Sequence, residues 1–202
     1  MAKSQWLNID PASGNGNGTI RNTASVHTGR VTRETTVTVR GTGVSSPATY
    51  KAKQKPKEEF VSFDNGSEMS APKGGGTVTV QGKSNSQALT FSWVGEADDV
   101  PLPENYTANG EPTANGTDID GDPGAANEYA HSVQFNFPAN NTVEEVERVL
   151  KVTAKGGQEA QITINQAAGD AFITVDPQEI TLEADGSEVI VTVKSNTQWT
   201  AE

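Results

Sequence analysis

The feature that most constrains this chain is an internal repeat with a spacing of about 112 residues. Residues 50–63 align with residues 162–175, and after a one-residue gap residues 75–85 align with residues 186–196. In both copies an alternating segment ends in Gln, a short turn follows, and a new segment opens on Phe. A repeat of this kind indicates that the chain holds more than one copy of the same structural unit.

Apolar and polar residues alternate along most segments between turns. Val78 and Val80, and their counterparts Val189, Val191 and Val193, have the period of two that is typical of strands with one buried face. The 20 Gly and 10 Pro fit short strands joined by many turns. Only Thr142–Glu147 is a candidate for a helical turn. We therefore predict an all-β fold made of antiparallel immunoglobulin-like sandwiches. Further strands are expected at 35–40, 48–53, 133–137, 149–154 and 159–165.

The sequence holds one complete copy of the repeated unit and two partial copies, and this predicts the domain organisation. Residues 58–170 make one complete module with an insertion at 94–130. Residues 1–57, the N-terminal piece, hold only the later strands of a module, and residues 171–202, the C-terminal piece, hold only the early ones. Neither piece offers more than three or four strands, so each would have open edges and too small a core alone. The sequence therefore predicts one complete module and one split between the two ends.

The linkers suggest how the split module is completed. Gln54 to Phe60 and Gln166 to Phe172 are six-residue steps, too short to span a sandwich roughly 35 Å long. The leading hypothesis is that the C-terminal piece of one copy completes the N-terminal piece of the next, head to tail. Two alternatives stay open: the sequence is trimmed from a longer tandem array, or the two pieces close together within one chain.

Charge is strongly segregated along the chain. The N-terminal piece carries a net charge of +7, residues 58–170 carry −13 and the C-terminal piece carries −5, for a total of −11. Opposite charges would help the two terminal pieces to meet and orient, whereas the overall negative charge disfavours nucleic acid as a partner. The predicted interface residues are Trp6, Arg21, Arg30, Arg33, Arg40, Phe172, Val189, Val191 and Trp199.

Several function classes are excluded or disfavoured by composition. The chain has no Cys, which excludes disulfides, thiolate nucleophiles and cysteine-bound metals. Neither His27 nor His131 lies in a nucleophile motif, and Glu144 and Glu145 are neighbours in a charged turn. No apolar run is long enough for a membrane span, and Met1 is not followed by a signal peptide. We expect a soluble protein without catalytic activity, cofactor or membrane association, made in a cytoplasm.

The insertion holds the residues that best fit a ligand site. Asp118, Asp120 and Asp122 alternate before a turn, as calcium loops require, but Pro123 and Tyr129 occupy the positions where such a loop needs Gly and a bidentate Glu. We expect a solvated acidic loop, with calcium as the weaker alternative. Tyr106 and Tyr129 are candidates for stacking on a glycan, whereas Trp93 follows Leu89 and Phe91 in alternation and is expected in the core.

The residues also carry a resemblance to a known family. Trp6, the run Pro11, Ser13, Gly14 and Gly16, Arg33 before a Thr/Val strand, and a closing strand ending in Gln54 resemble the BACON module. Arg148 and Gln166 repeat its second half, and Phe172 to Trp199 resembles its first half. The family is an immunoglobulin-like sandwich of gut Bacteroidetes surface proteins and of tailed phages that infect them, and its name implies glycan binding for some members.

Together with the predicted self-assembly, this resemblance implies a structural virion protein. We expect a capsid auxiliary (decoration) or head-fibre protein in the virion, contacting copies of itself and the major capsid protein or another virion protein. The alternative is a pair of carbohydrate-binding modules from an extracellular or cell-surface glycan-utilisation protein, with a glycan as partner.

Overall fold

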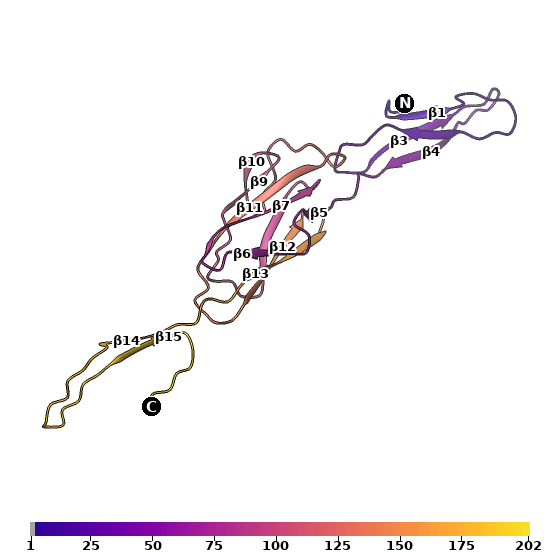
Figure 1. Ribbon diagram of the computed structural model, residues 1–202. Helices are drawn as coiled ribbons and strands as arrows, with labels where there is room; N and C mark the ends of the chain where they lie inside the picture. Colours follow the sequence, from indigo (N-terminus) through magenta and orange to yellow (C-terminus); the bar gives the residue numbers. More distant parts are fainter. Residues whose placement is uncertain (1–2) are drawn as a thin grey trace.

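The computed structural model describes residues 3–202, which form fifteen strands and no helix. The chain is laid out as three consecutive parts, with the N-terminal piece at one end, a sandwich in the middle and the C-terminal piece at the other end (Figure 1). The prediction of an all-β fold is confirmed. Within these residues there is no helix that could span a membrane.

The central module is a two-layer sandwich, as the alternating pattern predicts. One layer has the strand order β10-β9-β11-β7-β5 and the other β6-β13-β12-β8. Apart from β6, which runs parallel to β13, neighbouring strands are antiparallel. The strands are β5 (Val61–Phe63), β6 (Glu68–Ala71), β7 (Gly76–Ser84), β8 (Leu89–Val94), β9 (Asn105–Ala108), β10 (Glu111–Ala114), β11 (Tyr129–Phe137), β12 (Val146–Ala154) and β13 (Glu159–Gln166).

The core of this module lies between the two layers. Every second side chain of β11, from Tyr129 to Phe137, is buried, as expected for a strand with one face on the core. Opposite it, Leu150 and Val152 of β12 and Ile162 and Ile164 of β13 are almost fully buried. The insertion contributes β9 and β10 and adds Tyr106, Ala108 and Ile119 to the core, so it is largely an integral part of the sandwich.

The flanking pieces contain only two-stranded sheets. In the N-terminal piece, β1 (Leu7–Asp10) pairs with β2 (Arg21–Ala24), and β3 (Arg33–Val39) pairs with β4 (Ala48–Gln54). In the C-terminal piece, β14 (Ile173–Asp176) pairs with β15 (Thr192–Ser195). The backbone of residues 177–191 forms turns and irregular structure.

Two local predictions were wrong. Residues 142–144 form bends and not a helical turn, and β12 begins at Val146. The Asn140 side chain fixes this loop by accepting from the Thr142 backbone N–H and donating to the Glu144 carbonyl. The strand expected over Val189 to Val193 is present only from Thr192, whereas its counterpart β7 extends over nine residues. The difference has a physical reason, since β7 pairs with β11 along its full length and β15 has only β14 beside it.

His131 gives the central module a specific dependence on pH. Its side chain is 2% exposed, its Nε2 lies 3.2 Å from the Ser62 carbonyl oxygen, and its Nδ1 has no partner. Burial lowers the pKa of His131 to about 4 from its usual 6.5. The unfolded chain therefore binds more protons between these values, so the free energy of unfolding should fall as the pH is lowered through that range, by about 3 kcal/mol in all. Denaturant titrations between pH 7 and pH 4 check this, because a His131→Gln variant should lose that part of the slope.

Candidate functional site

The central module contains a buried, hydrogen-bonded pair, Arg148 and Gln166. The Arg148 guanidinium donates to Gln166 Oε1 and to Asp99, and it lies over the Phe137 ring at 5.4 Å. Gln166 Nε2 donates to two carbonyl oxygens, those of Pro72 at 2.9 Å and Pro138 at 2.8 Å. Pro72 follows β6, from the early half of the module, and Pro138 follows β11, from the late half. The Gln166 amide thus joins the two halves.

The N-terminal piece repeats part of this arrangement. Arg33 donates to Gln54 Oε1 at 2.8 and 2.9 Å and lies over the Trp6 ring at 4.7 Å. Gln54 Nε2 donates to the Ser25 carbonyl oxygen at 2.9 Å, as Gln166 does to Pro138. A counterpart of the bond to Pro72 is not present among the described residues. The N-terminal piece therefore has the late half of the arrangement without the early half.

The C-terminal piece repeats the other half of the same framework. Asn85 Oδ1 accepts from the Phe60 N–H, and Asn85 Nδ2 donates to the Glu58 carbonyl oxygen. Asn196 makes the same two bonds with Phe172 and Asp170. Ser84 and Ser195 likewise donate to the carbonyl oxygens of Phe60 and Phe172. These side-chain bonds, one for one, identify residues 171–196 as the structural counterpart of residues 59–85.

The central module and the C-terminal piece differ in how far their corresponding side chains are buried. In the central module Val78 and Val80 are 4% and 0% exposed, whereas their counterparts Val189 and Val191 are 38% and 37% exposed. Leu182, the counterpart of buried Ala71, is 64% exposed. The C-terminal piece therefore presents an apolar face to solvent, of a kind that marks interaction surfaces. It consists of Phe172, Ile173, Val175, Ile180, Leu182, Val189, Val191 and Trp199.

The N-terminal piece has an incompletely covered apolar face and an open strand edge. Leu7 and Val37 are buried, but Val39 is exposed where its counterpart in the strand register, Val152, is buried. In the central module β13 has β12 on one side and β6 on the other. Within residues 3–202, β4 is paired on one side alone. An unpaired edge beside an incompletely covered face is the usual acceptor for an added strand.

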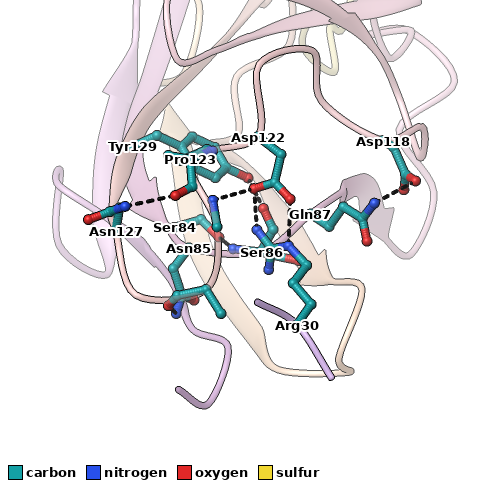
Figure 2. Close-up of polar contacts among 12 residues, drawn as sticks. Arg30, Ser84, Asn85, Ser86, Gln87, Asp118, Asp122, Pro123, Asn127 and Tyr129 are labelled. Carbon is teal, nitrogen blue, oxygen red and sulfur yellow. Dashed lines mark hydrogen bonds and ion pairs between the residues drawn. The ribbon is translucent and has the colours of Figure 1, made fainter. Parts of the chain in front are cut away.

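The predicted interface residues fall into three groups. Phe172, Val189, Val191 and Trp199 lie on the exposed apolar face, and Arg21 and Arg40 are exposed. Trp6 and Arg33 are half-buried and stack on each other inside the N-terminal piece. The prediction that Arg30 belongs to the interface is corrected, because its guanidinium is hydrogen-bonded within its own chain. Its Nε and Nη2 donate to the two carboxylate oxygens of Asp122 at 2.7 and 2.6 Å (Figure 2).

This Arg30 pair fixes the joint between the N-terminal piece and the central module. Arg30 Nη1 also lies 3.3 Å from Glu59, and the Ala125 N–H donates to the Thr28 carbonyl oxygen. The hydrogen bonds to Arg30 hold the pKa of Asp122 below its usual value, and the pKa of Arg30 is raised by the same contact. Sequence reasoning missed this joint, since nothing in the spacing of Arg30 and Asp122, 92 residues apart, indicates that they meet.

The three carboxylates proposed for calcium do not converge. Asp118 accepts from Lys155 Nζ at 2.7 Å and from Gln87 at 2.9 Å. Figure 2 shows Gln87 beside Asp118, and Arg30 facing Asp122. Asp120 is exposed. The described residues contain no group of three or more acidic or His side chains placed to hold a metal ion. Asp118 and Asp122 each pair with a different cation, Lys155 and Arg30, so the described carboxylates are not arranged around one ion.

The two tyrosines proposed for glycan stacking were predicted wrongly. Tyr106 and Tyr129 are each 3% exposed, with their hydroxyls bonded to the backbone of Leu89 and Ser86. Burial raises the pKa of both, that of Tyr129 to about 12. Their polar sequence neighbours concealed an alternation within β9 and β11. Trp93 packs against the core, as predicted, with its Nε1 donating to the Val100 carbonyl oxygen.

Similarity to known proteins is concentrated in the N-terminal piece. Residues 1–47 match the family described as "BACON: Putative binding domain, N-terminal". These residues are similar to a BACON segment. The match covers β1 to β3 and ends before β4, so it includes Trp6 and Arg33. Gln54 lies outside the match, so its role is supported by the repeat and by its bonds to Arg33 and Ser25. No curated protein matches the chain.

Two solved structures share a general likeness with the chain. An NMR structure of a protein from Bacteroides thetaiotaomicron is 17% identical with a TM-score of 0.28, covering 57% of this chain and 90% of that one. Extracellular cadherin domains 1–4 of protocadherin gamma B7 are 11% identical with a TM-score of 0.37. That alignment covers 96% of this chain and 48% of the cadherin chain.

The Arg30 joint yields a direct test. Arg30→Ala removes a half-buried bidentate pair, so the N-terminal piece should move more freely against the central module. We expect faster hydrogen exchange of the Ala125 amide and a broader distribution of dimensions in small-angle scattering. Lys57→Ala is the matched control, because its ion pair with Glu128 is about half exposed on both sides and contributes little. Equal effects of the two substitutions would contradict the assignment.

Proposed function

We propose that this protein is a non-catalytic structural protein whose copies assemble head to tail, the C-terminal piece of one copy completing the N-terminal piece of the next. The fold is a set of immunoglobulin-like β-structures, and residues 1–47 carry a BACON domain segment of binding type. The observation that carries the proposal is that the N-terminal piece has the Arg and Gln bonds of the late half of the central module, whereas the C-terminal piece has the Asn and Ser bonds of the early half. Each end has the bonds of one half and an exposed face where the other half would pack.

The layout of the chain favours pairing between copies over closure within one chain. The two terminal pieces lie at opposite ends of the central module (Figure 1). Both connections are short and fastened by Asn85 and Asn196, whose amides bind the linker backbone. Such a contact between copies joins two different surfaces, one from each copy, and is therefore heterologous. Repeated from copy to copy, it generates either a closed ring or an open array.

For the biological setting we propose a virion, with this protein as a capsid auxiliary (decoration) or head-fibre component. Repeated head-to-tail contacts suit a protein that covers or extends a particle built of identical units. The major capsid protein or another virion protein would then be the second partner. What supports this setting is the resemblance of the BACON segment to modules of phages and surface proteins, together with the assembly geometry.

The competing function is a pair of carbohydrate-binding modules on a cell surface or in a secreted protein. Its two named contact residues, Tyr106 and Tyr129, are buried. The largest exposed aromatic side chains, Phe172 and Trp199, lie on the C-terminal piece. Our proposal assigns them to the interface between copies, so a glycan would have to compete for the same face.

Light scattering coupled to size exclusion tests the assembly directly. The full chain should give masses that rise with concentration above the 21.3 kDa of one copy. Variants lacking residues 1–57 or residues 171–202 each retain one half of the interface, so each should stay monomeric. Mixed in equal amounts, they should form a one-to-one pair. High salt should slow this pairing, since the two pieces have opposite charges.

Two outcomes would contradict the proposal. A full chain that stays monomeric at high micromolar concentration, with rapid amide exchange in β4 and β15, would show that the pieces do not pair. A monomer with both strands protected would show that they close within one chain.

A further inference from the structure

We infer the register of the interface between copies, an inference that rests on the proposed head-to-tail assembly. Residues 179–182 of one copy add as a parallel strand to the open edge of β4 in the next copy. Gln54 Nε2 then donates its second N–H to the carbonyl oxygen of Glu183. Two strands from two copies thereby reproduce the β6 and β13 pair of the central module.

The central module supplies the template. β6 pairs with β13 in parallel, with Thr163 opposite Glu68 and Gln166 opposite Ala71. β4 and β13 correspond at a spacing of 112 residues, and both end in Gln. The sequence Glu68-Met69-Ser70-Ala71 corresponds to Glu179-Ile180-Thr181-Leu182 at the spacing that also relates residues 75–85 to 186–196. The same alternation therefore lies on both segments.

The conformation and exposure of residues 179–182 in a single chain are those expected of a strand segment without a partner strand. They form no strand, although their counterpart β6 does. Ile180 and Leu182 are exposed, whereas Met69 is half-buried and Ala71 is buried. β6 is bonded to β13 and to no other strand, so its conformation depends on that edge. The segment 179–182 lacks such an edge in its own chain.

The amide of Gln54 sets the position of the added strand. Gln166 uses both of its N–H groups, one for each half of its module. Gln54 uses one, toward Ser25. Glu183 is the counterpart of Pro72, so its carbonyl oxygen takes the place of the second acceptor. A shift by one residue would turn Ile180 and Leu182 to solvent, because side chains alternate along a strand.

Charge agrees with the same register. It places Glu179 opposite Lys51 and Thr181 opposite Lys53, on the solvent face of the sheet. In the single chain Lys51 and Lys53 both lie near Glu34, at 3.6 and 3.7 Å, with all three side chains more than half exposed. The added strand therefore brings an acidic residue to a basic edge, which favours this orientation over one with like charges opposed.

The absence of Cys allows the register to be measured with an introduced disulfide. In the double variant K53C/T181C the two thiols replace the counterparts of Asn165 and Ser70, which are paired residues in the template. Neighbouring strands place such Cα atoms about 4.8 Å apart, within the range that a disulfide spans. The expected result under mild oxidation is a ladder of multimers on a non-reducing gel that collapses to one band on reduction. K53C/E179C, displaced by two residues on the same face, is the matched control and should cross-link at least tenfold more slowly.

The outcomes separate this inference from the function on which it rests. Multimers in light scattering without a K53C/T181C ladder, or with a faster ladder in K53C/E179C, would overturn the register and leave the assembly standing. No multimers in either reduced variant or in the full chain would overturn the assembly itself. A cross-linked band with the mass of one copy would overturn both, since it would show closure within one chain.

Discussion

The structure depends on one constraint: half of a β-sandwich cannot cover its own apolar face or pair its own strand edges. The central module meets both needs within residues 61–166, where two layers enclose a common core and Gln166 bonds the early half to the late half. The terminal pieces meet neither, so Val189 and Val191 stay exposed and β4 keeps an open edge. Covering these groups would release free energy, which is the driving force of the proposed pairing between the ends.

In the proposed assembly, the two linkers determine which terminal piece can contact which. Asn85 and Asn196 hold the two short linkers in the same way, and Arg30 adds an ion pair to the insertion at the first joint. The insertion is the segment whose sequence best fits a ligand site. Through Asp122, it also helps to hold the N-terminal piece against the central module. A braced joint restricts the directions in which each piece points, so successive copies would repeat one geometry. That regularity is needed if a heterologous contact is to build a ring or an ordered array.

Much of the fold could be predicted from sequence because the information is local or repeated. Alternation located β3, β4, β12 and β13, and the repeat aligned Gln54 with Gln166 before any bond was visible. The errors have a common origin in contacts between distant residues. The pairing of Arg30 with Asp122, and the burial of Tyr106 in a strand surrounded by polar loops, depend on how the insertion folds back on the module. Val189 to Val191 alternate like a strand, yet strand formation there requires a partner that their own chain does not supply.

In the proposed assembly, the incomplete state of the ends also affects when copies pair. Residues 177–191 are irregular in the single chain, so forming the interface must order them, and this cost in conformational entropy is subtracted from the gain of burial. Pairing is then weak between free copies and rises with their local concentration. Copies held side by side on a common surface have a high effective concentration, so the same interface that is marginal in dilute solution becomes stable there. Under the proposed assembly, this ordering cost would keep free copies apart and favour pairing where a common surface gathers them.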